Sequence, residues 1–333
     1  MVSKRVLSFM VLLLGGLFFT LQAQVKIGII GLDTSHATAF SKLLNADDKK
    51  AEYKEFKIVA AYPYGSKTIK SSVDRIPQYT EEVKKYGVEI VNSIAELLDK
   101  VDCVMLETND GNVHLEQAAE VFKAGKIVFI DKPIGANLAQ AIAIFELANK
   151  YNVPVFTSSA LRFSKESLKL RNGEMGEVFG ADCYSPAHLE PSHSDFTWYG
   201  IHGVETLFTV MGPGCKSVNR MSTENSDVVV GEWKDGRIGT FRGLRTKSEY
   251  GGIAFTEKGV VPVGGYDGYG LLLDEILKFF KTRIAPVSEQ ETLEIFTFME
   301  ASNQSKRYAG KIISMDATFK QGQKQAKKLI KKI

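Results

Sequence analysis

The chain has 333 residues, more than one compact core usually holds, so two domains are expected. Hydrophobic residues make up 44% and charged residues 24%, which is typical of a globular protein and argues against a disordered or fibrous chain. The net charge is only +3, and the basic cluster 324–332 is best interpreted as the solvated face of a helix, so no nucleic-acid partner is expected.

The first 23 residues have the pattern of a secretory signal peptide. Lys4 and Arg5 precede the apolar stretch 6–21, and Leu21–Ala23 is a plausible cleavage site. We therefore predict cleavage after Ala23 and an exported, periplasmic protein. No later stretch is apolar over a membrane-spanning length, so stable membrane insertion is not expected.

Between residues 24 and 157, short apolar runs alternate with segments of helical periodicity. Strands separated by such helices predict right-handed parallel crossovers, hence a doubly wound parallel sheet of the Rossmann type. The expected strands are Val25–Ile30, Lys57–Tyr62, Val88–Asn92, Val101–Leu106, Ile127–Ile130 and Val153–Thr157, and the expected helices are Ala37–Leu44, Thr80–Tyr86, Ile94–Leu98, Leu115–Ala124 and Leu138–Tyr151.

Residues 158–333 show a different pattern, with frequent glycines and alternating apolar runs. This predicts a second, α+β domain with a mainly antiparallel open sheet. Its expected strands are Val178–Tyr184, Val228–Trp233, Ile238–Arg242 and Ile253–Thr256, and its helices lie near Val204–Met211, from Tyr269 onward, and over Gln290–Ala309.

A lysine stands at the carboxyl end of the fifth predicted strand, in the run Ile130-Asp131-Lys132-Pro133. Ligands of open α/β sheets bind at this edge. Lys132 is therefore either a solvated surface cation or a proton donor that faces a substrate.

The turn after the first strand resembles a dinucleotide-binding loop in part. Such loops read G-x-G-x-x-G, and here Gly31 fills the first glycine position while Asp33 and His36 fill the other two. Thr34 and Ser35 complete the turn. Asp33 or Ser35 either caps the following helix or takes part in a modified nucleotide contact.

Two further strand ends carry polar residues. No acid follows the second strand to bind an adenosine ribose, so Ser66 and Lys67 either suit a 2′-phosphate or form a plain surface turn. After the fourth strand, Thr108, Asn109 and His114 either line a cofactor cleft or belong to an Asx-type turn.

In the second half, His202 and Glu205 are three residues apart and share a face if a helix begins there. His202 is either structural or a group that exchanges a proton near neutral pH. Tyr184, His188 and His193 lie just upstream and are weaker candidates for the same cleft.

The three cysteines show neither a disulfide framework nor metal-ligand spacing, and no metal is predicted. Cys103 lies in an apolar strand, where a buried inert thiol is expected. A bridge between Cys183 and Cys215 after export is left open.

These motifs together resemble the Gfo/Idh/MocA oxidoreductase family. The resemblance covers the predicted mature chain and rests on the strand-turn-helix start, on D-K-P at Asp131–Pro133, on Arg162-Phe163, on G-I-H-G-V-E at Gly200–Glu205, and on Ala285–Glu294. It implies a Rossmann domain followed by an open α/β domain, NAD(H) or NADP(H) as cofactor, and a sugar or cyclitol as substrate.

The resemblance also assigns roles to residues. Lys132 corresponds to the lysine of the family's E-K-P motif and His202 to its late histidine, which makes these two the expected catalytic residues. The expected cofactor contacts are Gly31, Asp33, Thr34, Ser35, His36, Thr108, Asn109, His114, Asp131 and Lys132, and the expected substrate contacts are Arg162, Tyr184 and Glu205.

Two positions depart from the family pattern. The glycine turn is altered at Asp33 and His36, and Trp198 stands where many members carry an aspartate four residues before the histidine. Either the usual proton relay is therefore incomplete, or Glu205 or another acid replaces the aspartate. The expected function is an NAD(P)-dependent oxidoreductase for a sugar, cyclitol or glycoside hydroxyl. The alternatives are a redox-neutral glycosidase or epimerase with tightly bound NAD, and a non-catalytic sugar-binding protein. A homo-oligomer is expected from the family's open sheet.

Overall fold

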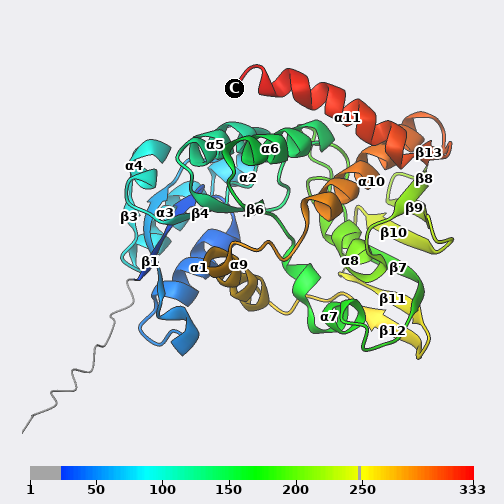
Figure 1. The fold of residues 1–333 in the computed structure, drawn as a ribbon, viewed down its shortest axis with the longest axis horizontal. Coiled ribbons are helices and arrows are strands. Elements are labelled where there is room, and N and C mark those ends of the chain that lie inside the picture. The colour runs from blue at the N-terminus through cyan, green and yellow to red at the C-terminus, as the bar shows by residue number, and fades with distance from the viewer. Residues whose placement is uncertain (1–23, 247–248) are drawn as a thin grey trace, which may run out of the picture.

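The structure is a computed structural model that describes residues 24–246 and 249–333 (Figure 1). The predicted signal peptide lies outside the described residues. Two sheets organise the described chain, and each corresponds to one half of the sequence.

The first sheet has six parallel strands in the order β3-β2-β1-β4-β5-β6, which confirms the predicted Rossmann topology. Strands β4 and β5 are buried along their whole length because helices cover both faces of the sheet. The strands are β1 (Val25–Ile30), β2 (Phe56–Tyr62), β3 (Glu89–Ile90), β4 (Cys103–Leu106), β5 (Ile127–Ile130) and β6 (Val155–Phe156).

The helices of this half divide between the two faces of the sheet. Helices α4, α5 and α6 share one apolar core with the sheet, and α1 and α3 contribute to the core on the opposite face. The elements are α1 (Ser35–Asn45), the short 3₁₀ turn Ala51–Tyr53, α2 (Lys70–Val73), α3 (Ile76–Lys84), α4 (Ile94–Leu98), α5 (Gly111–Lys123) and α6 (Leu138–Tyr151).

The second sheet has seven strands in the order β12-β11-β7-β10-β9-β8-β13. Only the β7–β10 pair is parallel, so the sheet is mainly antiparallel, as predicted. The strands are β7 (Val178–Pro186), β8 (Cys215–Ser222), β9 (Ser226–Trp233), β10 (Ile238–Leu244), β11 (Gly251–Thr256), β12 (Gly259–Val263) and β13 (Ile313–Ser314).

One face of the second sheet is covered by α8 (Ile201–Met211) and α10 (Glu289–Arg307), whose apolar side chains join its core. A 3₁₀ turn, η2 (Ala160–Phe163), and α7 (Lys165–Arg171) connect the two sheets. Three cysteines lie buried and free, so the bridge left open between Cys183 and Cys215 is not formed.

Two helices from the second half return to the first domain. Helix α9 (Gly270–Thr282) places Leu272, Leu273 and Phe279 in the core beneath the Rossmann sheet, on the side of α1. Helix α11 (Met315–Ile330) lies along α6 at the top of Figure 1 and exposes its lysines to solvent, as predicted. No helix of the described residues is long and apolar enough to cross a bilayer.

Candidate active site

A cavity of about 370 Å³ lies at the carboxyl ends of β1, β4 and β5. This is the edge at which open α/β sheets bind ligands, and the second domain closes the other side. The cavity is lined by Thr34, Ser35, His36, Arg75, Asn109, Asp131, Lys132, Ser159, Ala160, Leu161, Tyr199, His202, Tyr250, Tyr266 and Tyr269.

The turn after β1 requires glycine at its first position only. Gly31 has φ +90°, and a Cβ there would lie 2.5 Å from Thr108 Oγ1. Asp33 at the second position is fully buried, and its carboxylate accepts hydrogen bonds from the backbone N–H groups of Ser66 and Asn109. Burial raises the pKa of Asp33 to about 6, although these N–H groups oppose the shift.

Asp33 therefore does not cap the next helix, and neither does Ser35, whose hydroxyl lies 2.8 Å from Tyr269 Oη. Thr34 occupies the N-cap of α1 without a side-chain hydrogen bond to the helix. The first backbone N–H groups of α1 are thus left open toward the cavity. An uncapped helix N-terminus of this kind binds phosphate and other anions.

These observations decide how well a dinucleotide fits the altered turn. The Asp33 carboxylate is turned toward Ser66 and Asn109, so it leaves the helix N-terminus accessible. Arg75 donates from Nη1 to the carbonyl of Asp33 and lines the cavity, which places a permanent cation beside the turn. The open amides of α1 and Arg75 therefore fit a diphosphate despite the loss of two glycines.

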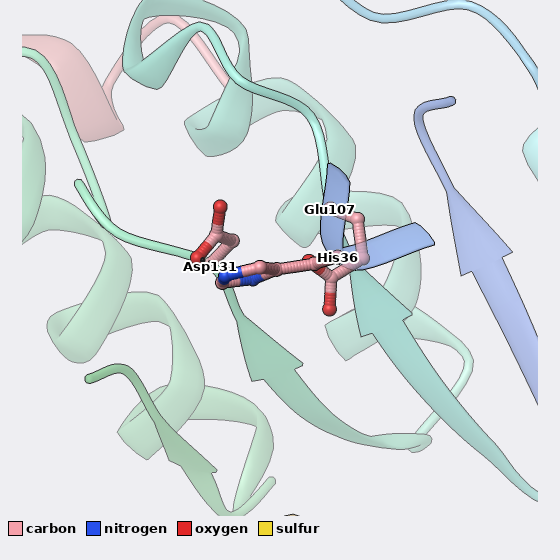
Figure 2. Close-up of side chains that lie close together, drawn as sticks. All are labelled: His36, Glu107 and Asp131. Carbon is pink, nitrogen blue, oxygen red and sulfur yellow. Dashed lines mark ion pairs between the residues drawn. The ribbon is translucent and has the colours of Figure 1, made fainter. Parts of the chain in front are cut away.

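His36, at the third glycine position, lies between two carboxylates (Figure 2). Its Nδ1 is 3.1 Å from Asp131 Oδ1 and 3.3 Å from Glu107 Oε2. All three side chains are buried. Burial opposes protonation of His36, but Asp131 and Glu107 outweigh it and raise its pKa to about 10. Burial raises the pKa of Glu107 to about 7.

Lys132 and His202 face the same cavity from different domains. Lys132 Nζ lies 3.5 Å from Asp131 Oδ2, and its side chain is 14% exposed. His202 Nδ1 lies 2.7 Å from the Ser159 hydroxyl. Burial and the nearby charge of Lys132 lower the pKa of His202 to about 3, so its imidazole is neutral at pH 7.

Four tyrosines complete the wall of the cavity. The hydroxyl of Tyr250 donates to that of Tyr199 at 2.9 Å, and both rings contact His202 edge-on. Tyr266 and Tyr269 pack edge-to-face with each other, and Tyr269 also contacts His36. Aromatic faces bearing hydroxyl groups suit a ligand that is apolar on one side and polar at its rim.

Three expected substrate contacts lie outside this cavity, and we correct those predictions. Arg162 and Glu205 are buried and pair with each other at 2.8 Å, and Arg162 also donates to Glu291 at 2.6 Å. Glu205 further accepts from Ser158 Oγ and Ser159 N, so it is not a partner of His202. Tyr184 points to the exposed outer face of the second sheet.

Among the expected cofactor residues, Thr108 and His114 do not line the cavity. His114 is buried, its ring nitrogens lie 2.7 and 3.2 Å from the carbonyls of Thr108 and Ile134, and burial lowers its pKa. It links the loops after β4 and β5. Ser66 is buried and donates to Asp110, so it is not available to a 2′-phosphate.

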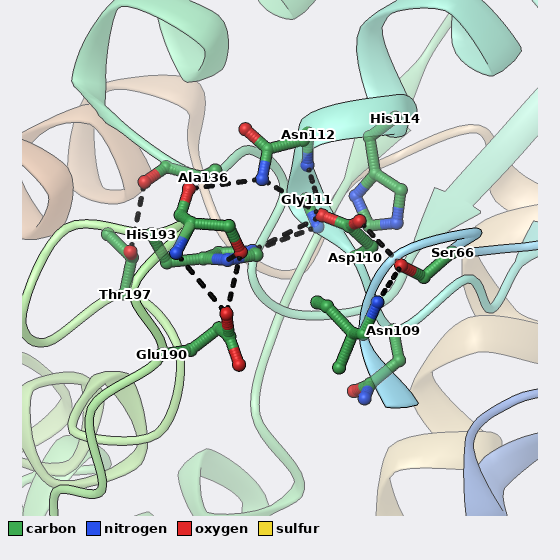
Figure 3. Close-up of polar contacts among 12 residues, drawn as sticks. Ser66, Asn109, Asp110, Gly111, Asn112, His114, Ala136, Glu190, His193 and Thr197 are labelled. Atoms are coloured by element: carbon green, nitrogen blue, oxygen red, sulfur yellow. Dashed lines mark hydrogen bonds and ion pairs between the residues drawn. The ribbon is translucent and has the colours of Figure 1, made fainter. Parts of the chain in front are cut away.

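The other two upstream histidines also have structural surroundings, and Figure 3 shows those of His193. His193 accepts from the backbone N–H of Gly111 and packs against Trp198, the residue at the family's aspartate position. The His188 ring contacts Tyr199 rather than lining the cavity itself. These contacts tie the loop after β7 to the start of α5 and hold the two domains together beside the site.

Several site residues were not predicted from the sequence, namely Arg75, Glu107 and the four tyrosines. Glu107 had a usable signal, because an acid directly after a buried strand falls at the ligand edge of the sheet. Tyr199 lies in the loop before α8, Tyr250 directly precedes β11, and Tyr266 and Tyr269 lie between β12 and α9, so nothing in their spacing indicates that they meet.

Comparison with known proteins agrees with this geometry. The family model described as an oxidoreductase family with an NAD-binding Rossmann fold (Gfo/Idh/MocA) matches residues 25–159. Residues 25–159 are thus similar to the NAD-binding Rossmann domain of that family. The chain is 25% identical over 138 residues to the uncharacterized oxidoreductase YhhX of Escherichia coli (strain K12), a match that covers 38% of this chain and 40% of that protein.

Solved structures of the same fold extend over the second domain. A probable dehydrogenase from Thermotoga maritima has a TM-score of 0.71 and 21% identity and covers 88% of this chain and all (100%) of its own. Scyllo-inositol dehydrogenase from Lactobacillus casei, solved with NAD(H) and scyllo-inositol, has a TM-score of 0.68 and 13% identity and covers 88% of this chain and 99% of its own. At these identities the likeness shows a shared fold across both domains.

Proposed function

We propose that this protein is an NAD(P)-dependent oxidoreductase that interconverts a secondary hydroxyl and a carbonyl on a sugar, cyclitol or glycoside ring. The observation that carries the proposal is the convergence of Lys132, neutral His202 and the open N-terminus of α1 on one cavity. The match of the Rossmann domain to an NAD-binding oxidoreductase family supports the cofactor class.

Each part of the cavity has a role in this proposal. The open amides of α1 and the Arg75 guanidinium would hold the diphosphate of the dinucleotide, whose nicotinamide would supply hydride transfer. Lys132 takes the proton of the substrate hydroxyl during oxidation and returns it during reduction. The Asp131 carboxylate, 3.5 Å from Nζ, orients the lysine.

His202 positions the substrate oxygen opposite Lys132. Because its imidazole is neutral and Nδ1 contacts the Ser159 hydroxyl, the ring can form a hydrogen bond with a hydroxyl without adding charge. The tyrosine wall fits a sugar ring, since its rings cover the C–H face and its hydroxyls meet the polar rim. A scyllo-inositol dehydrogenase among the solved relatives supports this substrate class.

Replacement of Lys132 tests the proposal. We expect Lys132→Met to lower kcat by about 10²- to 10⁴-fold, the usual contribution of a general acid or base, while NADH binding measured by fluorescence is retained. Lys324→Met on the exposed face of α11 is the matched control. Unchanged turnover in Lys132→Met would refute the assignment of Lys132.

The same assay separates the proposed function from its alternatives. A free sugar that yields one equivalent of NADH per ketone supports the dehydrogenase. Release of an aglycone from a glycoside without change in added NAD would replace it by the redox-neutral glycosidase. No uptake of NAD or NADP at saturating concentration would leave the non-catalytic sugar-binding protein.

We also propose that the outer face of the second sheet packs against a second copy of the chain. This face exposes a row of large apolar side chains, namely Met221, Val230, Ile238, Ile253 and Phe255. Exposed apolar patches of this kind mark protein interfaces. Light scattering should show an oligomer, and Phe255→Glu should shift it toward the monomer. A monomeric wild-type chain would refute this.

The localisation follows from the leader-like start of the sequence. We propose that the chain is exported and cleaved after Ala23. Sequencing the N-terminus of the mature protein from a cell fraction tests both points, and a cytoplasmic protein with an intact start would contradict them.

A further inference from the structure

The charged cluster beneath the cavity contains several buried polar atoms that make no hydrogen bond. Among the described residues, His36 Nδ1, both Glu107 oxygens and Asp131 Oδ2 are buried without a hydrogen bond. Buried polar atoms are nearly always paired, and a buried carboxylate without partners costs several kcal/mol. These atoms contact each other and Lys132 only as ion pairs of 3.1 to 3.5 Å, so four neighbouring buried atoms keep unused capacity to bind a further ligand.

The three side chains come from the three strand ends that meet at the centre of the sheet. Glu107 and Asp131 directly follow β4 and β5, and His36 opens α1 after β1 (Figure 2). One ligand atom from each lies within 4.8 Å of the other two. The strand order β1-β4-β5 thus brings together three residues that are far apart in the sequence.

The distances fit a coordination shell. Ligands bound about 2.0–2.2 Å from one ion lie about 3.0–3.5 Å from each other in octahedral or tetrahedral geometry. The Nδ1–Asp131 and Nδ1–Glu107 distances are 3.1 and 3.3 Å. An Nδ1–H bond to the carboxylates has similar lengths, but neither contact has the geometry of a hydrogen bond, and Nδ1 is left without one.

We propose that His36, Glu107 and Asp131 bind a divalent first-row transition-metal ion in the floor of the cavity. One imidazole and two carboxylates, without thiolate, suit Zn²⁺, Mn²⁺ or Fe²⁺. The backbone N–H of Lys132 donates to Asp131 Oδ1 at 2.8 Å and holds that ligand in place. Because His36 and Asp131 line the cavity, the remaining positions on the ion face the ligand space.

Such an ion has a defined use in the proposed reaction, and this role rests on the proposed function. Bound to the oxygen of a hydroxyl or ketone, it would polarise that oxygen as a Lewis acid beside Lys132. Metal binding itself does not depend on that reaction.

The test measures metal uptake without substrate or dinucleotide. The full mature chain, stripped with a chelator, is dialysed against Zn²⁺ and its metal content is measured. We expect one equivalent of Zn²⁺ per chain and a Zn²⁺-dependent rise in Tm. When Co²⁺ replaces Zn²⁺, we expect the absorption spectrum of protein-bound Co²⁺ at the same stoichiometry. Glu107→Gln should weaken binding by more than about 100-fold, beyond the usual cost of losing an outer partner.

Asp33→Asn is the matched control, since it removes a buried carboxylate from the same sheet edge outside the cluster. It should bind Zn²⁺ like the wild type. Wild-type protein that takes up no Zn²⁺ or Co²⁺ in excess would overturn the proposal and leave His36 as an imidazolium between two acids. Stoichiometric binding retained by Glu107→Gln would also overturn it. Lys132→Met should lose turnover but keep its metal content. This result separates the proposed oxidoreductase function from the proposed metal site.

Discussion

Two buried clusters of charged side chains differ in how fully the protein pairs them. In the second domain, Arg162 donates to Glu205 and Glu291, and Glu205 also accepts from Ser158 and Ser159. At the sheet edge, His36, Glu107 and Asp131 lie close together but leave four atoms without hydrogen bonds. Of the Arg162 cluster, only Arg162 Nη2 is left unpaired.

The difference follows from where the clusters lie. The Arg162 cluster joins η2, α8 and α10, and neither Glu205 nor Glu291 lines the active-site cavity. The His36 cluster lies beneath the cavity at the carboxyl ends of three strands. Charges that a protein pairs by itself hold its fold, whereas charges it leaves incompletely paired at a ligand edge indicate a functional site.

The largest expected effect is on the paired cluster. Glu205→Ala leaves Arg162 buried with one partner fewer, and we expect the free energy of unfolding to fall by about 3–5 kcal/mol. Urea denaturation measures it. The control is Glu81→Ala, which removes an exposed partner of Lys84 and should change stability little. If Glu205→Ala lowered the free energy of unfolding as little as the control does, the paired cluster would not hold the fold, and the contrast between the two clusters would be wrong.

A smaller effect is expected at Asp33, whose buried carboxylate has a pKa raised from 3.8 to about 6. Because the folded pKa is above the unfolded value, the native state binds more protons, and stability falls as pH rises from about 4 to about 6. The full change is at most about 3 kcal/mol. Asp33→Asn has no titratable group at position 33, so this decrease in stability with pH should be absent from it.

Urea denaturation of both proteins across that pH range measures the difference. We expect the stability of Asp33→Asn relative to the wild type to increase with pH and to level off above about pH 7. Parallel pH profiles would show that Asp33 is ionised normally in the fold. Glu291, whose pKa is lowered chiefly by Arg162 against the effect of burial, contributes in the opposite direction and is present in both proteins.

The smallest stability effect is expected at the unpaired cluster. Glu107→Gln removes a buried carboxylate that makes no hydrogen bond, and His36 keeps Asp131 as its other charged neighbour, so metal-free protein should be destabilised by less than about 1 kcal/mol or be stabilised. Thermal unfolding in chelator measures this. A loss comparable to that of Glu205→Ala would mean that Glu107 holds the fold.

Much of the fold could be predicted from the sequence because its signals are local. Unbroken apolar runs such as Ile127–Ile130 predicted buried parallel strands, and alternation along Val228–Trp233 predicted a half-exposed one. Strand β8 (Cys215–Ser222) was missed, since its mixed polar sequence contains Lys216, Asn219 and Arg220. Arg220 is buried there because Asp227, Asn303 and Asp195 accept its hydrogen bonds.

The candidate site was predictable only in part. Lys132, Asp131 and Asn109 could be placed at the cavity because each follows a recognisable strand. Arg162 and Glu205 were misassigned because a family motif does not reveal whether an ion pair is buried or faces a ligand. Asp33 was ambiguous for a similar reason, since its partners Ser66 and Asn109 come from other strand ends.

By itself the sequence determined the order of strands and helices, the Rossmann topology, and a lysine at the ligand edge of the sheet, because periodicity and turn residues act over a few positions. The tertiary structure decided which polar residues face one cavity. It joined four tyrosines from distant loops into one wall, paired Arg162 away from the cavity, and brought His36, Glu107 and Asp131 to one point. These outcomes depend on contacts between side chains from distant segments and on how the two domains pack, which no short stretch of sequence encodes.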